Sequence, residues 1–288
     1  MAAADRDRKF GLSAKARRVV LPVAGLAVAV VIVGTVTNRG GGSSAGDGPV
    51  VGDDLHAVGR LGDRLVVGGH GGAGYRPPSG GWTQIDTLDD KDVMGWADSD
   101  GVFLAGGHAG LYRSTDGGDT FAAVEGLPIS DVHALGASGS RVYLGSPETG
   151  VLVSNDGGAK FEPVTDAAGQ DFMGSIWVDP SNADIAVAPS MQGGAVETTD
   201  GGRTWSPLGS SSGAMAVAVS NDGQQIVALG MNGAERSMDA GATWNSLDVP
   251  DATSAATYTS QGDLVVAALS GDRAQVYKSV GSRWTSLR

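Results

Sequence analysis

The chain has 288 residues, 47 of them glycine, and a net charge of −12 at neutral pH. It contains no cysteine, which excludes disulfide bonds, thiolate metal sites, cysteine nucleophiles and a lipoprotein anchor. Residues 1–38 hold six of the 20 Lys/Arg and two of the 32 Asp/Glu, which leaves 14 basic and 30 acidic residues for the remainder. Such an acidic surface repels nucleic acid, so we exclude that class of partner.

The first element in chain order is an uncharged apolar run over residues 19–36, preceded by a basic segment over residues 1–18. A run of this length is just enough to cross a hydrocarbon core of ~30 Å. The positive charge before the run predicts that the N-terminus stays in the cytoplasm. We therefore expect a single-pass signal anchor in the cell membrane and a flexible Gly/Ser linker over residues 37–52, with the C-terminal domain outside the cytoplasm.

The alternative for the same run is a cleaved signal peptide, which would release a secreted protein. Ser43 and Ala45 have the spacing of the two small residues before a cleavage site, but they lie well past the apolar run. Arg17 and Arg18 directly before the run also weakly resemble a twin-arginine signal.

The remaining chain, residues 53–288, repeats one turn motif at a regular spacing. The clear copies read STDGGDTF (114–121), SNDGGAKF (154–161), TTDGGRTW (198–205) and SMDAGATW (237–244), and worn copies end at Trp82 and Trp284. The aromatic residues that close the six copies are about 40 residues apart, a period that is typical of a β-propeller. They are Trp82, Phe121, Phe161, Trp205, Trp244 and Trp284.

Six copies predict an all-β fold, a six-bladed β-propeller whose blades each have four short antiparallel strands. Apolar and β-branched runs separated by glycine, aspartate and serine support this assignment. The repeated turn falls between the third and fourth strands of a blade. We expect the ring to close with whole blades, without a strand from the far end of the chain. The predicted blades cover residues 53–85, 92–124, 132–164, 171–208, 213–247 and 253–287.

The motif S-x-D-x-G-x-T-W resembles the Asp-box, or BNR repeat, of bacterial sialidases and, more distantly, of sortilin-type receptors. Residues 106–114 (GGHAGLYRS) and 171–174 (DFMG) further resemble exported actinobacterial Asp-box proteins labelled glycosyl hydrolase or exo-sialidase. The resemblance implies the propeller fold, and it implies that the Asp-box is a structural turn shared by enzymes and binding proteins. The acceptors in these turns are Asp116, Asp156, Asp200 and Asp239.

Scarce residues gather at two positions of the repeat: the start of the innermost strand and the loop between the second and third strands. All four histidines and five of the seven methionines fall there. Both positions lie near the central channel, on the face opposite the Asp-box turns, where propellers usually bind ligands. We call them the His/Met ring; its members are His56, His70, Met94, His108, His133, Met173, Met191, Met215 and Met231.

An acidic rim accompanies the ring, formed by Asp54, Asp92, Asp131 and Asp171, each two residues before a ring position. Residues two apart in a strand share a side, so each carboxylate is expected beside its own ring residue. Imidazole and thioether ligands together suit copper, and a carboxylate can orient the second nitrogen of a ligating histidine. The sequence predicts either a copper site or a ring of Met and His that merely fills the channel mouth.

Two classes of function remain open at this stage. One is a membrane-tethered propeller that binds copper or a protein on its channel face. The alternative is a glycosyl hydrolase-like protein that uses the acidic rim on a glycan, although no spacing singles out the two carboxylates that such an enzyme needs. Sialidases grip their substrate with three arginines. Here Arg113 and Arg236 fall on third strands, whereas Arg141 and Arg203 fall on the Asp-box face, so we expect no sialidase activity.

Overall fold

The computed structural model describes residues 48–165 and 168–288, so the predicted membrane segment and most of the predicted linker lie outside the described residues. In the described part, no helix is long and apolar enough to span a membrane. The helical structure found there is the single turn η1 (Asp86–Leu88), and the rest of the regular structure consists of 25 strands. The predicted all-β fold is confirmed for this part of the chain.

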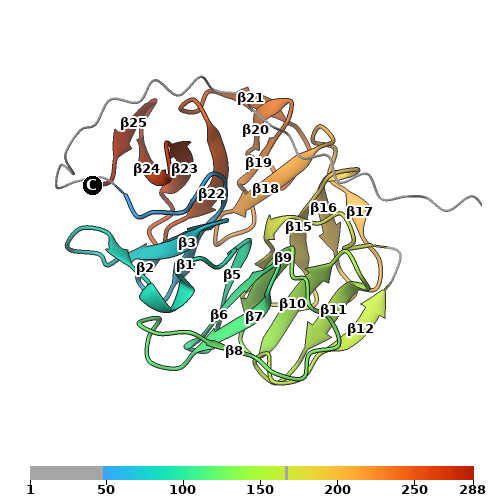
Figure 1. Ribbon diagram of the computed structural model, residues 1–288. Helices are drawn as coiled ribbons and strands as arrows, with labels where there is room; N and C mark the ends of the chain where they lie inside the picture. Colours follow the sequence, from blue (N-terminus) through green and yellow to red (C-terminus); the bar gives the residue numbers. More distant parts are fainter. Residues whose placement is uncertain (1–47, 166–167) are drawn as a thin grey trace, which may run out of the picture. The chain divides into compact units, whose positions relative to one another are not determined.

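The strands form six sheets arranged around a common centre, each built from consecutive strands (Figure 1). Antiparallel pairing between neighbouring strands makes each sheet a propeller blade. The first three blades comprise β1 (Leu55–Leu61), β2 (Arg64–Gly69), β3 (Gly72–Arg76), β4 (Thr83–Gln84); β5 (Gly95–Ser99), β6 (Val102–Gly107), β7 (Gly110–Ser114), β8 (Ala122–Ala123); and β9 (Ala134–Ser138), β10 (Arg141–Ser146), β11 (Gly150–Ser154), β12 (Glu162–Thr165).

The last three blades follow the same order, except that the innermost strand of blade four is divided into β13 and β14. They comprise β13 (Gly174–Ser175), β14 (Trp177–Val178), β15 (Ala186–Ser190), β16 (Gly194–Thr198), β17 (Ser206–Pro207); β18 (Ala214–Val219), β19 (Ile226–Gly230), β20 (Gly233–Ser237), β21 (Asn245–Leu247); and β22 (Thr253–Tyr258), β23 (Leu264–Ser270), β24 (Arg273–Val280), β25 (Arg283–Ser286). The six predicted blades are therefore confirmed.

Blade four departs from the regular pattern because its chain crosses the centre of the ring. Strand β13 pairs in parallel with β9 of blade three, whereas β14 pairs with β15 of its own blade. At the crossing, Gly174 adopts a φ of 69°, a conformation that glycine reaches without strain. A side chain there would come within 3.1 Å of the Met215 carbonyl oxygen and 3.7 Å of the His56 carbonyl oxygen, so the strand lies against two other blades.

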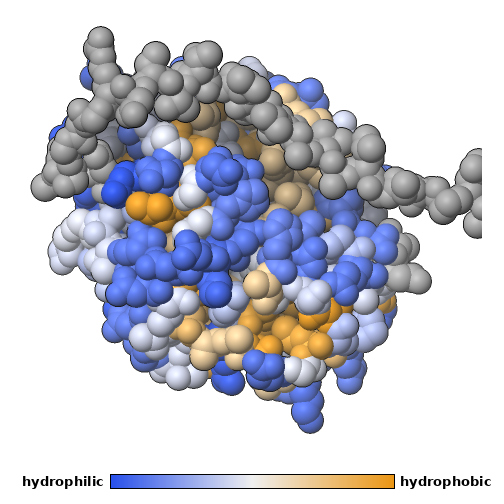
Figure 2. All heavy atoms as spheres, viewed as in Figure 1, coloured by the Kyte–Doolittle hydropathy of each residue, from blue (hydrophilic) through white to orange (hydrophobic). Residues whose placement is uncertain are grey.

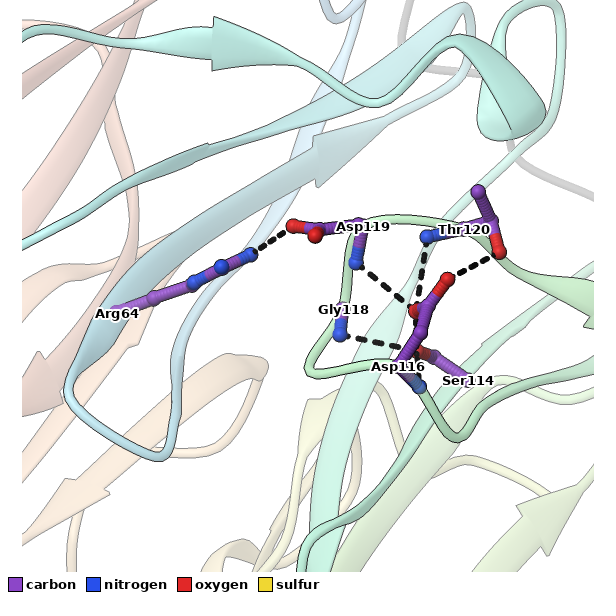
Figure 3. Close-up of polar contacts among 6 residues, drawn as sticks. All are labelled: Arg64, Ser114, Asp116, Gly118, Asp119 and Thr120. Carbon is purple, nitrogen blue, oxygen red and sulfur yellow. Dashed lines mark hydrogen bonds and ion pairs between the residues drawn. The ribbon is translucent and has the colours of Figure 1, made fainter.

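The repeated turns between third and fourth strands are closed by their own side chains (Figure 3). In blade two, Asp116 accepts hydrogen bonds from the backbone N–H of Asp119 and Thr120 and from the Thr120 hydroxyl. The Ser114 hydroxyl donates to Asp116 and accepts from the Gly118 N–H at 2.9 Å. These donors hold the pKa of the Asp116 carboxyl well below its usual range. Asp156, Asp200 and Asp239 make equivalent turns.

The aromatic residue after each turn packs between neighbouring blades. The indole N–H of Trp244 donates to the Leu208 carbonyl of blade four at 2.9 Å, and Trp284 repeats the contact one blade later. Trp82 of blade one donates in the same way to the Leu287 carbonyl of blade six at 3.0 Å. The repeat thus closes the ring between the first and the last blade.

Residues at the start of the described chain reinforce this closure. The backbone N–H groups of Val51 and Gly52 donate to the Asp272 carbonyl, and the Ala274 N–H donates to the Pro49 carbonyl. Val51 is fully buried in the core between blades one and six. Residues 48–52, which the sequence placed in the linker, are therefore packed against the propeller, although no strand of either sheet comes from the far end of the chain.

The core is divided into six clusters of buried apolar residues. Each cluster joins neighbouring blades, as when Leu104 of β6 and Leu144 of β10 share a cluster with Phe161. Most buried members of the clusters are aliphatic, and aromatic side chains such as Phe103 and Tyr143 add to them. On the face that Figure 2 shows, hydrophilic residues predominate and hydrophobic residues form separate patches.

Candidate functional site

The four histidines lie in a row across blades one, two and three. Ring centroids are 4.5 Å apart for His56 and His70, 6.1 Å for His70 and His108, and 5.1 Å for His108 and His133. His56 lies in β1 and His133 directly precedes β9, whereas His70 and His108 occupy the tight turns after β2 and β6. The two repeat positions thus meet in space, and we call these four residues the histidine row.

The carboxylate of Asp92 lies between two members of the row. Its Oδ1 is 3.5 Å from Nε2 of His56, and its Oδ2 contacts Nδ1 of His108. Two further carboxylates contact the row: Asp131 Oδ1 is 3.2 Å from His133 Nε2, and Asp53 Oδ1 is 3.4 Å from His70 Nδ1. Asp53 was not among the predicted residues, because its only sequence signal is its position beside Asp54.

Three overlapping sets in the row bring candidate ligand atoms within 4.8 Å of one another. Each set contains two imidazoles and one carboxylate, a combination that binds divalent transition metals. The end sets use different residues, whereas the middle set shares one histidine with each end. The sets are Asp54, His56 and His70; His70, Asp92 and His108; and His108, Asp131 and His133.

Burial keeps part of the row in the form that can bind a metal. Burial, helped by the neighbouring imidazoles and opposed by Asp92, lowers the pKa of His56 to about 4. Burial also lowers the pKa of His133, against the effect of Asp131. Both rings are therefore neutral at pH 7, with a nitrogen lone pair available. Among the described residues, no well-oriented hydrogen bond reaches either oxygen of Asp92 or Nε2 of His56 and His133, although all are buried.

The predicted methionines occupy the remaining part of the ring and differ in exposure. Met94 is buried directly before β5, whereas Met231 is 67% exposed in the turn after β19. Met173 precedes β13, Met191 follows β15 and Met215 lies in β18, and all three are partly buried. Blades one to three thus supply the histidines, whereas blades four and five supply four of the five methionines.

The expected pairing of each rim carboxylate with its own ring residue is only partly observed. Asp131 contacts His133 as expected. Asp92 instead contacts histidines of blades one and two, and the side chain of its expected partner, Met94, is buried. Asp171 accepts hydrogen bonds from the Ser190 hydroxyl and the Gln192 N–H, so it closes the turn after β15.

A second candidate site lies at the other ends of the innermost strands. A cavity of about 450 Å³ there is lined by all six blades, among them Arg60 of β1, Trp96 of β5 and Trp177 of β14. The sequence argument missed it because it searched only the face that propellers usually employ. Arginine and tryptophan within the inner strands are the signal that was available.

Comparison with solved structures identifies β-propellers of the GH74 class as structural neighbours. The xyloglucanase from Xanthomonas campestris aligns with a TM-score of 0.58 at 17% identity, covering 85% of this chain and 46% of that chain. An ancestral GH74 enzyme aligns with a TM-score of 0.55 at 16% identity, covering 84% of this chain and 39% of that one. The chain spans less than half the length of these enzymes.

Another neighbour is the extracellular domain of a putative hybrid two-component system from B. thetaiotaomicron, with a TM-score of 0.53, 13% identity, and coverage of 77% of this chain and 32% of that chain. No protein-family model matches the chain, and the comparison with curated proteins found no match. At these identities the likeness shows the β-propeller fold alone. The terms Asp-box and sialidase-like therefore rest on the sequence motif.

Proposed function

We propose that this protein binds a divalent transition-metal ion, foremost copper(II), in the histidine row. The observation that carries the proposal is the sharing of Asp92 between His56 and His108, within three sets of two imidazoles and one carboxylate. Buried carboxylate oxygens and imidazole nitrogens without well-oriented hydrogen bonds are costly unless a further partner satisfies them. A cation in the row would be such a partner.

The donor types favour copper(II) over the other common ions. Nitrogen and oxygen ligands bind copper(II) more tightly than the other divalent ions of its series, whereas magnesium and calcium prefer cages of oxygen alone. Copper(I) prefers thioether sulfur, and most of the predicted methionines belong to blades four and five. On this basis His56, His70, His108 and His133 would be the principal ligands, with Asp54, Asp92 and Asp131 balancing the charge.

The overlap of the three sets limits how many ions the row can hold. A neutral imidazole offers one lone pair, so His70 and His108 can each serve one ion at a time. The two end sets share no residue and can be filled together, whereas an ion in the middle set occupies a histidine of each end. The row therefore holds one ion at its middle or two at its ends.

The test is a titration of the full chain with copper(II) after removal of bound metal by a chelator, followed by calorimetry. Wild type should bind with at least micromolar affinity, and the His70→Ala/His108→Ala double variant should lose most of it, because every set contains one of these residues. Met231→Ala is the matched control, since this exposed ring residue lies in another blade. Equal, weak copper uptake by wild type and double variant would contradict the proposal.

The second candidate is a carbohydrate-active protein, and the fold likeness to two GH74 enzymes favours it. A screen with xyloglucan and other soluble glycans, measuring release of reducing ends, tests this directly. Turnover that survives metal removal but is lost on Asp131→Asn would support use of the acidic rim by an enzyme. Absence of turnover would favour a binding protein, and its ligands would then include proteins as candidates.

The sequence also supports a proposed location. The apolar run of residues 19–36 and its basic flank would tether the propeller to the outer side of the cell membrane. An extracytoplasmic domain without cysteine meets copper in an oxidising setting, in which copper(II) is the stable form.

A further inference from the structure

The cavity at the ends of the innermost strands is separate from the histidine row. Gly174 and Ser175 cross the centre of the ring between the two regions, and the backbone of Gly174 lies against carbonyl groups of His56, Met94 and Met215. The cavity, of about 450 Å³, is within the range of volumes that hold small organic molecules. All six blades contribute to its lining, so its shape is fixed by the closed ring.

Three residues of the cavity lining carry buried hydrogen-bond donors without acceptors. Nη1 of Arg60, Nε1 of Trp96 and Oγ of Ser175 are buried, and none has a hydrogen-bond partner in the described part of the chain. Arg60 also forms no ion pair with the described residues, although the protein is strongly acidic. A buried guanidinium nitrogen and a buried indole N–H of this kind normally face an acceptor.

The carboxylate of Asp98, which lines the same cavity, is already engaged. Both carboxylate oxygens of Asp98 accept backbone hydrogen bonds, one from the Gly62 N–H and the other from the Gly101 N–H, each at 2.9 Å. They hold two loops in place and are not paired with Arg60. The residues that line the cavity therefore include unsatisfied donors, which a ligand that brings acceptors would satisfy.

We propose that this cavity binds a small organic carboxylate. A planar carboxylate matches the two-pronged geometry of one guanidinium, and the Trp96 indole and the Ser175 hydroxyl would add neutral donors. A phosphate dianion fits less well, because the lining offers one cation and the carboxylates of Asp98 and Asp100 lie in the same lining.

The rest of the lining defines the body of the ligand. Ile176, Trp177, Val217 and Val219 supply apolar surface, and Tyr258 adds an aromatic side chain whose pKa is raised by burial. Aromatic and aliphatic walls favour a ligand whose carboxylate is attached to an apolar or ring-containing group. Such a molecule would place its charge at Arg60 and its body against Trp177.

The test measures binding of benzoate, indole-3-acetate and galacturonate to the full chain by ligand-observed NMR and calorimetry. At least one of these carboxylates should bind at millimolar concentration or below, whereas the uncharged benzamide and indole-3-acetamide should not. Arg60→Gln should weaken carboxylate binding by about tenfold or more, the usual effect of losing a charge-assisted hydrogen bond. Arg60→Lys should retain part of it.

The matched control is Arg283→Gln, which removes the same charge from an exposed position on β25, outside the cavity lining. It should leave carboxylate affinity unchanged, and circular dichroism should show the same fold for all variants. The proposal is overturned if none of the three carboxylates binds wild type, or if Arg60→Gln and Arg283→Gln behave alike. Copper binding by the histidine row should be the same in Arg60→Gln and wild type, so failure of either proposal leaves the other separately testable.

Discussion

Gly174→Ala is expected to destabilise the propeller at the point where β13 crosses the centre of the ring. The position combines a φ of 69° with a methyl contact of 3.1 Å to the Met215 carbonyl oxygen. A left-handed backbone costs a residue with a side chain about 1–2 kcal/mol, and forcing an extra methyl into a packed centre costs about 1–3 kcal/mol. The two effects together predict a loss of about 2–5 kcal/mol in the free energy of unfolding.

Two control substitutions separate these effects. Gly262 has a φ of 84° with nothing within 4 Å of an added methyl, so Gly262→Ala should cost only the backbone part, about 1–2 kcal/mol. Gly81 has no positive φ and equally open surroundings, so Gly81→Ala should be neutral or stabilising by about 0.4–1 kcal/mol. Urea unfolding followed by tryptophan fluorescence measures all three. A loss for Gly174→Ala no larger than that for Gly262→Ala would refute the crossing of the ring centre by β13.

The remaining predictions concern pH, the turns, activity and location. In metal-free protein, the lowered pKa of His56 should contribute up to about 3 kcal/mol to the free energy of unfolding above pH 6.5. This contribution should be lost as the pH falls to about 4, because the buried ring must then be protonated. The stability of His56→Gln should therefore depend less on pH than that of wild type. Asp200→Ala should lower the melting temperature, because Thr204 and Thr198 lose their acceptor. Copper binding per folded molecule should not change. A stable variant that has lost copper binding would refute a purely structural role for Asp200. A fluorogenic sialoside should not be hydrolysed, and turnover abolished by substituting one exposed arginine would show otherwise. Full-length protein should fractionate with membranes and be digested by protease added to intact cells, whereas a soluble form beginning near residue 46 would indicate signal cleavage.

Much of the fold was readable from the sequence because its determinants are local. In each clear turn the aspartate, its hydroxyl partners and the two small residues lie within a few positions of one another, so Asp116 and its turn are visible without tertiary information. The period of the closing aromatics then fixes the number of blades, since each aromatic contacts the preceding blade. The positions of the histidines within the same repeat also predicted that they lie on one face of the propeller.

Which carboxylate contacts which histidine in the candidate site depended on the tertiary structure. Sequence alternation assigned Asp92 to Met94, but the folded chain places its carboxylate between His56 and His108, which come from different blades. The division of the innermost strand of blade four was equally invisible, because pairing of β13 with β9 depends on how six blades meet at the centre.

The sequence by itself therefore determined the repeat, the turns and the positions from which a site could be built. Only the tertiary structure decided which side chains share a space, because contacts between blades join residues that are far apart in the chain. The cavity around Arg60 shows this most clearly: its lining is drawn from six inner strands, and its unsatisfied donors exist only once the ring has closed around them.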